Sequence, residues 1–133
     1  MVLRRYHAAR ELRAVDVPPL GRLIRFATSG LGASLLVEPA LGEVLFLVTV
    51  RGATPSFVSS SLRQFTAAAR AVVHRYPYYT LTSSPDEVIE AAADIARIIE
   101  AIDPPAMTPD LYWATFVDDM RAGAFASELL TSD

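Results

Sequence analysis

Few side chains in this sequence could catalyse a reaction or hold a metal ion. The two histidines, His7 and His74, have no second candidate ligand one helical turn away. The chain has no cysteine, which excludes thiolate nucleophiles, cysteine-bound metals and disulfides, and it has no lysine nucleophile. The sequence therefore predicts a protein without catalytic residues, metal or cofactor, and an enzyme is the least favoured class of function.

Paired carboxylates are the strongest remaining candidates for chemistry. Glu90 and Asp94 lie one helical turn apart, and Asp118 is followed directly by Asp119. Such pairs serve acid–base catalysis or bind hard metal ions when other groups support them, but no such group accompanies them here. Two interpretations stay open: a solvated outer helix face, or an acidic surface that binds a basic partner.

The serine-rich and glycine-rich segments favour backbone roles over catalysis. Ser59, Ser60 and Ser61 have no base nearby in the sequence, and serines at the step from a strand to a helix commonly cap the helix. Gly30 and Gly32 precede strand-like residues instead of a helix. This arrangement argues against a phosphate-binding loop.

Charge is distributed unevenly along the chain. Residues 1–75 hold ten arginines and four acids, a net charge of +6, whereas residues 76–133 hold two arginines and eleven acids, a net charge of −9. The total of −3 argues against a dedicated nucleic-acid binder, which would be strongly basic. An acidic surface instead suits a basic protein partner.

Three tyrosines form a second candidate contact surface next to an acidic helix start. Tyr76, Tyr78 and Tyr79 lie in one loop, and Asp86 and Glu87 follow at the start of the next predicted helix. Aromatic side chains in such a loop either cover the edge of a core or anchor a protein interface. In the second case they would form an aromatic centre with an acidic rim, a docking surface for a basic protein.

The sequence carries no recognisable signal for export or membrane insertion. Charged residues at positions 10, 11 and 13 interrupt any apolar run near the start. The longest apolar run, residues 44–50, is far shorter than the roughly 20 residues of a membrane helix. We expect a cytoplasmic protein with no membrane contact, present as a monomer or weak homodimer.

Length and hydropathy indicate a single α+β domain over residues 1–133. With 52% hydrophobic residues the chain can bury one substantial core. Antiparallel strands are predicted over residues 22–26, 34–38 and 44–50, with a short edge pairing at 57–58. The strand at 44–50 is apolar on both alternating faces, which predicts that both are covered. The expected architecture is an antiparallel sheet of three to five strands packed against three or four helices.

Helices are predicted on both sides of this strand block. Residues 3–15 have helical composition and end at Pro18 and Pro19, and whether residues 1–18 are ordered is left open. Further helices are predicted at 60–75, from a Ser84 cap, and from a Thr108 cap. Their apolar faces are explained by core formation and consist of Leu62, Phe65, Ala69, Val72 and Tyr76; Val88, Ala92, Ile95, Ile99 and Ile102; and Tyr112, Trp113, Phe116, Val117 and Met120.

Several short motifs, taken in order, resemble the SUKH superfamily of bacterial immunity proteins, in particular its fourth subgroup. The resemblance runs from about Leu20 to Gly123 and departs from the family at Ser59, where asparagine is usual. The matching positions, which the resemblance implies to be structural, are Gly42, Ser60, Ser61, Leu62, Phe65, Asp103, Pro104 and Trp113.

The resemblance implies a function that composition alone would not reach. Proteins of this family are thought to neutralise cognate toxins by binding them directly, and the toxins tend to act on nucleic acid. The residues expected to contact such a toxin are Tyr76, Tyr78, Tyr79, Asp86, Glu87, Glu90, Asp94, Asp118 and Asp119. The alternative function is a small regulatory domain in which the sheet face or the loop at Gly30 and Gly32 binds a small molecule or peptide.

Overall fold

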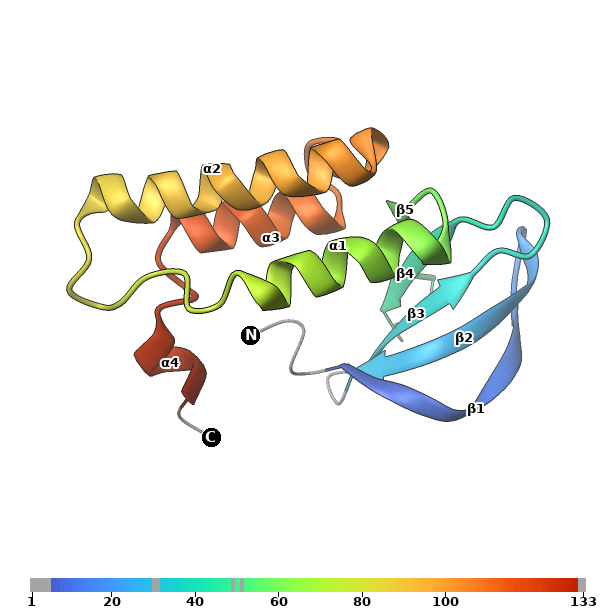
Figure 1. Ribbon diagram of the computed structural model, residues 1–133. Helices are drawn as coiled ribbons and strands as arrows, with labels where there is room; N and C mark the ends of the chain where they lie inside the picture. The colour runs from blue at the N-terminus through green and yellow to red at the C-terminus, as the bar shows by residue number, and fades with distance from the viewer. Residues whose placement is uncertain (1–5, 30–31, 49, 51, 132–133) are drawn as a thin grey trace.

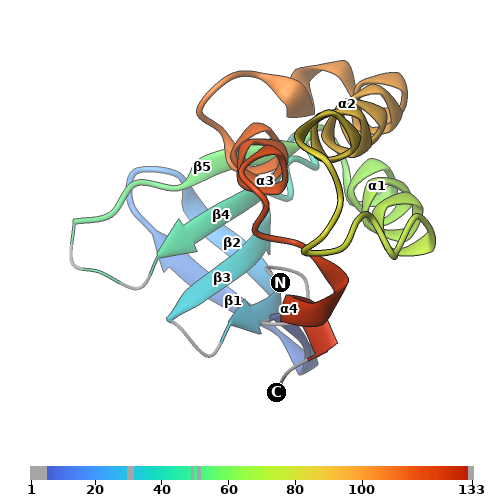
Figure 2. The same cartoon turned by 90° about the vertical axis from the view of Figure 1, so that its left-hand side faces the viewer.

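The first half of the chain forms an antiparallel sheet and the second half forms helices that cover one of its faces (Figures 1 and 2). The computed structural model describes residues 6–29, 32–48, 50 and 52–131, without the side chains of 6–11, 29 and 131. The sheet has the order β1-β2-β3-β4-β5, so each strand pairs with the next one along the chain. The strands are β1 (Tyr6–Val17), β2 (Gly21–Ser29), β3 (Ala33–Val37), β4 (Val44–Val48) and β5 (Ser56–Ser59).

The helices form a layer in which α2 packs against both α1 and α3. Both α1 and α3 also contact β5, which places them directly over the sheet (Figure 2). The elements are α1 (Leu62–His74), α2 (Pro85–Ile102), the 3-10 helix η2 (Pro104–Met107), α3 (Tyr112–Arg121) and α4 (Ser127–Thr131).

The sheet is apolar on both faces, and each face has its own buried cluster. Leu35 and Val44 join the main core with Trp113, Phe116 and the buried residues of α1 and α2. The next residue along each strand points the other way, so Leu36 and Leu45 form a second cluster with Val17 and Leu23. The prediction that the strand at 44–50 is covered on both faces is therefore confirmed at its start, at Val44 and Leu45, whereas Val48 and Val50 are exposed.

The N-terminal helix predicted over residues 3–15 is wrong. Residues Tyr6–Val17 form β1, a long strand that pairs antiparallel with β2 and shifts register between Ala8 and Arg13. Val15 and Val17 alternate with Asp16, as residues of a strand do, and both pack in the second cluster. Pairing and burial thus outweigh helical composition, and residues 3–5 lie outside the described part of the chain.

The helix predicted to start at a Thr108 cap begins later, at Tyr112, with Leu111 at the cap position. The Thr108 hydroxyl is engaged elsewhere, because it donates to the carbonyl of Pro105 at 2.7 Å. Asp110 has φ +67°, a left-handed conformation that ends any helical path from Thr108. By contrast, α2 ends at Ile102 before Asp103 and Pro104, as predicted, and its Ser84 capping box is present.

Candidate functional site

A buried carboxylate joins the start of α1 to the end of α2. Asp103 is only 1% exposed. Its Oδ1 accepts from the Ser60 hydroxyl at 2.6 Å, and its Oδ2 accepts from the Ser60 backbone N–H at 2.7 Å. Both are hydrogen bonds to a charged acceptor, the stronger class. Two positions that carry the family resemblance, 43 residues apart in sequence, therefore form one contact.

The neighbouring serines complete this junction. The Ser61 hydroxyl caps α1 by accepting from the backbone N–H of Gln64 at 3.1 Å, as predicted, and the Gln64 side chain donates to the carbonyl of Ile102 at 3.3 Å. Ser59 is fully buried and its hydroxyl accepts from the Trp113 indole at 3.4 Å. The junction thus links β5, α1, α2 and α3.

The remaining signature positions contribute in different ways. Phe65 and Trp113 are buried with ring centroids 6.0 Å apart. Gly42 has φ +77° in the turn before β4, a conformation that favours glycine. Leu62, in contrast, is 42% exposed at the first position of α1, so it adds little to the core.

The structure corrects the position of one tyrosine in the predicted contact surface. Tyr79 is buried, and its hydroxyl donates to the carbonyl of Met120 and accepts from the backbone N–H of Phe125. Burial raises the pKa of this phenol above its ordinary value. Tyr79 therefore holds the loop against α3 and does not reach the surface.

The other two tyrosines stay nearer to solvent. The Tyr78 hydroxyl donates to the carbonyl of Val72 at 2.8 Å, and burial, with Tyr76 nearby, raises its pKa to about 12. Tyr76 is 36% exposed and packs edge-on against Tyr78, with centroids 5.8 Å apart. Part of the predicted aromatic patch is thus accessible.

The acids on the outer face of α2 are paired with arginines. Arg97 lies 3.2 Å from Glu90 and 3.8 Å from Asp94, and Arg75 lies 3.2 Å from Asp94. Tyr78 lines a cavity of about 360 Å³ with Arg75, Glu90 and Asp94. This surface is of mixed charge, because two arginines offset the two acids that the sequence places there.

The two acids at the start of α2 lie apart from that cavity. Glu87 is fully exposed, and its carboxylate accepts from the backbone N–H of Ser84 in the capping box, which lowers its pKa. Asp86 is its exposed neighbour in the first turn of the helix. Both carboxylates lie where the helix dipole favours negative charge, so they stabilise α2 itself.

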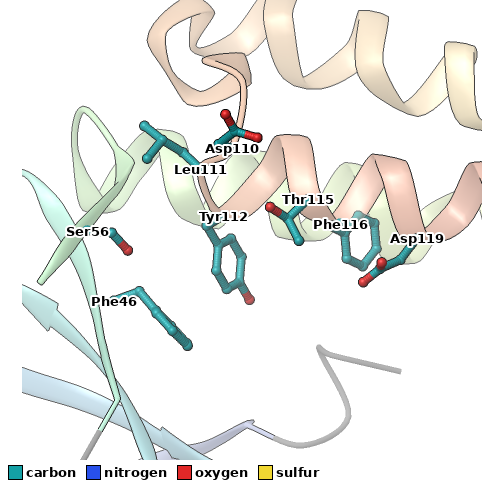
Figure 3. Close-up of a pocket in the computed structure, with 8 residues that line it drawn as sticks. All are labelled: Phe46, Ser56, Asp110, Leu111, Tyr112, Thr115, Phe116 and Asp119. Atoms are coloured by element: carbon teal, nitrogen blue, oxygen red, sulfur yellow. The ribbon is translucent and has the colours of Figure 1, made fainter. Parts of the chain in front are cut away.

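The acids of α3 differ from each other although they are adjacent. Asp118 pairs with Arg121 at 2.9 Å. Asp119 lines a different cavity of about 270 Å³ between α3 and the ends of β4 and β5 (Figure 3). The residues around this cavity are Phe46, Ser56, Asp110, Leu111, Tyr112, Thr115, Phe116 and Asp119. Sequence reasoning missed Phe46 and Asp110, because only the sheet pairing and the left-handed turn bring them beside α3.

A match to one protein family covers most of the chain. The family model described as SUKH-4 immunity protein matches residues 4–119, a range that includes the sheet, α1, α2 and most of α3. The chain belongs to the SUKH-4 immunity protein family. Neither the comparison with curated proteins nor that with solved structures found a match. The resemblance stated from the sequence motifs is confirmed, and membership in SUKH-4 supports an immunity function in a toxin context.

The described residues provide neither a cluster of metal ligands nor a membrane-spanning helix. Within residues 6–29, 32–48, 50 and 52–131, no group of three or more potential ligands could hold a metal ion. In the same part of the SUKH-4 chain, no helix has the length and apolar character needed to cross a membrane. His74 is exposed in the last turn of α1, whereas the His7 side chain and Gly30 lie outside the described residues.

Proposed function

We propose that this protein neutralises a cognate toxin by binding it directly in a stoichiometric complex. The observation that carries the proposal is the match to the SUKH-4 immunity protein family over residues 4–119. The signature residues support the same view, because Asp103, Ser60 and Trp113 serve packing and leave recognition to surface side chains.

The toxin is a nucleic-acid-targeting enzyme, such as a nuclease or deaminase, and is met in the cytoplasm. An enzyme that binds nucleic acid carries a basic surface to neutralise phosphates. The acidic second half of this chain complements such a surface and speeds the encounter, while apolar and aromatic contacts slow dissociation. Binding over the toxin's active face would block access of the nucleic acid.

Two surfaces are candidates for this contact. The first is the predicted one, with Tyr76 and Tyr78 beside the acids of α2, where Arg75 and Arg97 offset the negative charge. The second is the cavity beside α3, where Asp110 and Asp119 lie among aromatic side chains.

Co-expression tests the proposed function. Candidate toxin domains are those encoded by genes beside the gene of this protein. We expect this protein to restore growth of cells that express the toxin, and to form a complex of one copy of each chain in size-exclusion chromatography with light scattering. Absence of both growth rescue and a complex would refute the proposal. Turnover of a substrate by the purified protein would refute the non-catalytic mechanism.

A further inference from the structure

The cavity beside α3 is a groove, the α3 groove, with an apolar floor and a negatively charged rim. Its floor is formed by Phe46 and Tyr112, whose ring centroids are 5.7 Å apart, together with Phe116 (Figure 3). Phe46 and Tyr112 are only partly buried, so their rings remain accessible from the groove. Partly exposed aromatic rings of this kind provide contact area at low cost in conformational entropy.

The rim carries one carboxylate at each end. Asp110 lies just before α3, and Asp119 lies about two turns beyond Tyr112, roughly 10 Å along the helix axis. Both side chains are exposed, and within the described residues neither takes part in an ion pair of 4.0 Å or less. Among the described residues that line the groove there is no arginine or lysine.

This groove therefore differs from the cavity beside α2. There, Arg75 and Arg97 lie within ion-pair distance of Glu90 and Asp94, so a cationic partner would have to displace them. Beside α3 the negative charge has no such competitor among the lining residues that the structure describes. Charge complementarity for a basic partner is thus greater at the α3 groove.

We propose that the groove between α3 and the ends of β4 and β5 binds a basic segment of the toxin. The segment carries two arginine or lysine side chains, one for Asp110 and one for Asp119, with an apolar side chain between them on Phe46 and Tyr112. The aliphatic stems of the basic side chains lie along the rings while their charged ends face the rim. This inference rests on the proposed function and identifies its contact surface.

Removing the rim charges tests the inference with little risk to folding. The double variant Asp110→Asn/Asp119→Asn keeps the size of both exposed side chains. We expect about tenfold weaker binding to the toxin domain, chiefly through slower association, and a weaker dependence on salt. The control is Asp118→Asn, which removes one negative charge from the position next to Asp119 but outside the groove. Its affinity should stay within about twofold of the natural protein.

A second variant tests the groove by blocking it. Thr115 is exposed on α3 and lines the groove, so Thr115→Arg adds both bulk and positive charge there without disturbing the core. We expect affinity for the toxin domain to fall about a hundredfold or more, because like charges are then brought together. Unchanged toxin binding by both groove variants would overturn the inference while the proposed function stands.

A peptide probe makes the inference testable even if no neighbouring toxin binds. Ac-Arg-Leu-Ala-Arg-amide, titrated into isotope-labelled protein, should shift the amide signals of Ser56, Thr115 and Asp119, and the double variant should abolish these shifts. Absence of shifts, or equal shifts in the double variant, would overturn the groove assignment. Self-association of the natural protein that Thr115→Arg abolishes would also overturn it, because the occupant would then be a second copy of the chain.

Discussion

Asp103 places a charged side chain inside the molecule, and its partners explain why this is tolerated. An unpaired buried carboxylate is costly, but Ser60 supplies both a hydroxyl and a backbone N–H to its two oxygens. The same serine lies beside the cap of α1, so the contact fixes the start of one helix against the end of another. The prediction that the three serines cap the helix is confirmed for Ser61. The contact of Ser60 with Asp103 was not predicted from the sequence.

Removal of the Ser60 hydroxyl should destabilise the protein through this junction. Ser60→Ala leaves Asp103 with one hydrogen bond fewer to its buried charge, which costs about 1.5–3 kcal/mol in the free energy of unfolding. Urea denaturation followed by circular dichroism measures the change. The control is Thr66→Ala on the exposed face of α1, expected to change stability by less than about 0.5 kcal/mol. Equal effects of the two substitutions would show that the Ser60–Asp103 contact contributes nothing.

At the scale of elements, the segment between α1 and α2 is held by its tyrosines. The Tyr78 hydroxyl donates to the carbonyl of Val72 in α1. The Tyr79 hydroxyl donates to the carbonyl of Met120 in α3 and accepts from the backbone N–H of Phe125. The Ser127 backbone N–H also donates to the carbonyl of Tyr79 at 2.9 Å. This segment therefore connects α1, α3 and the start of α4.

These two phenols should make the protein unstable in alkali. The pKa of Tyr78 is raised from 10.0 to about 12 and that of Tyr79 is also raised, in both cases chiefly by burial, so the unfolded chain loses these protons first. Their stabilisation is complete below about pH 10 and is lost as the pH rises toward 12. The chain has no lysine or cysteine whose titration would obscure this range.

Urea midpoints measured from pH 8 to pH 12 test this expectation, with tyrosinate absorbance recorded in parallel. The Tyr78→Phe/Tyr79→Phe variant should be less stable at neutral pH, because backbone partners lose their hydrogen bonds, but its stability should decline less steeply in alkali. If the urea midpoint falls equally steeply with pH in the variant and in the natural protein, the alkaline instability arises from groups other than these two tyrosines.

The elements that the sequence predicted well are those with strong local signals. Ser84 and Glu87 form the expected capping box, the apolar stripe of α2 is buried at Ala92, Ile95 and Ile99, and the helix ends at Ile102, before Asp103. The two elements that the sequence predicted wrongly depend on strand pairing and on turn conformation, which composition does not reveal. The strand Tyr6–Val17 is specified by its pairing with β2, and the late start of α3 depends on the Thr108 contact and the left-handed Asp110.

The candidate site shows the same division. Sequence alone indicated acids on α2 and α3. One of the arginines that offset the acids of α2, Arg75, lies at the end of α1, just after its last residue. The α3 groove combines Phe46 and Ser56 from the sheet with side chains more than 50 residues later in the chain. No periodicity within one segment can reveal such a site, because the tertiary fold creates it.

At the scale of the whole molecule, the sheet separates two apolar clusters of unequal size. The main cluster lies between the sheet and the helices and contains Trp113, the largest fully buried side chain. The second is formed by strand residues alone, with Val17, Leu23, Leu36 and Leu45 buried on the other face. A sheet covered by helices on one face is usually solvated on the other, but here Val15 and Val17 of β1 pack in the second cluster and so contribute to its burial.

Adjacent leucines of β3 test whether both clusters stabilise the fold. Leu35 is 2% exposed in the main cluster and Leu36 is 1% exposed in the second. Each change to alanine should cost about 2–5 kcal/mol in the free energy of unfolding, because it leaves a cavity among packed side chains. Leu41→Ala, at a residue 75% exposed in the turn before β4, should cost less than about 0.5 kcal/mol. If Leu36→Ala behaves like Leu41→Ala, the second cluster is too loosely packed to stabilise the sheet, and β1 would then be held by its hydrogen bonds to β2 alone.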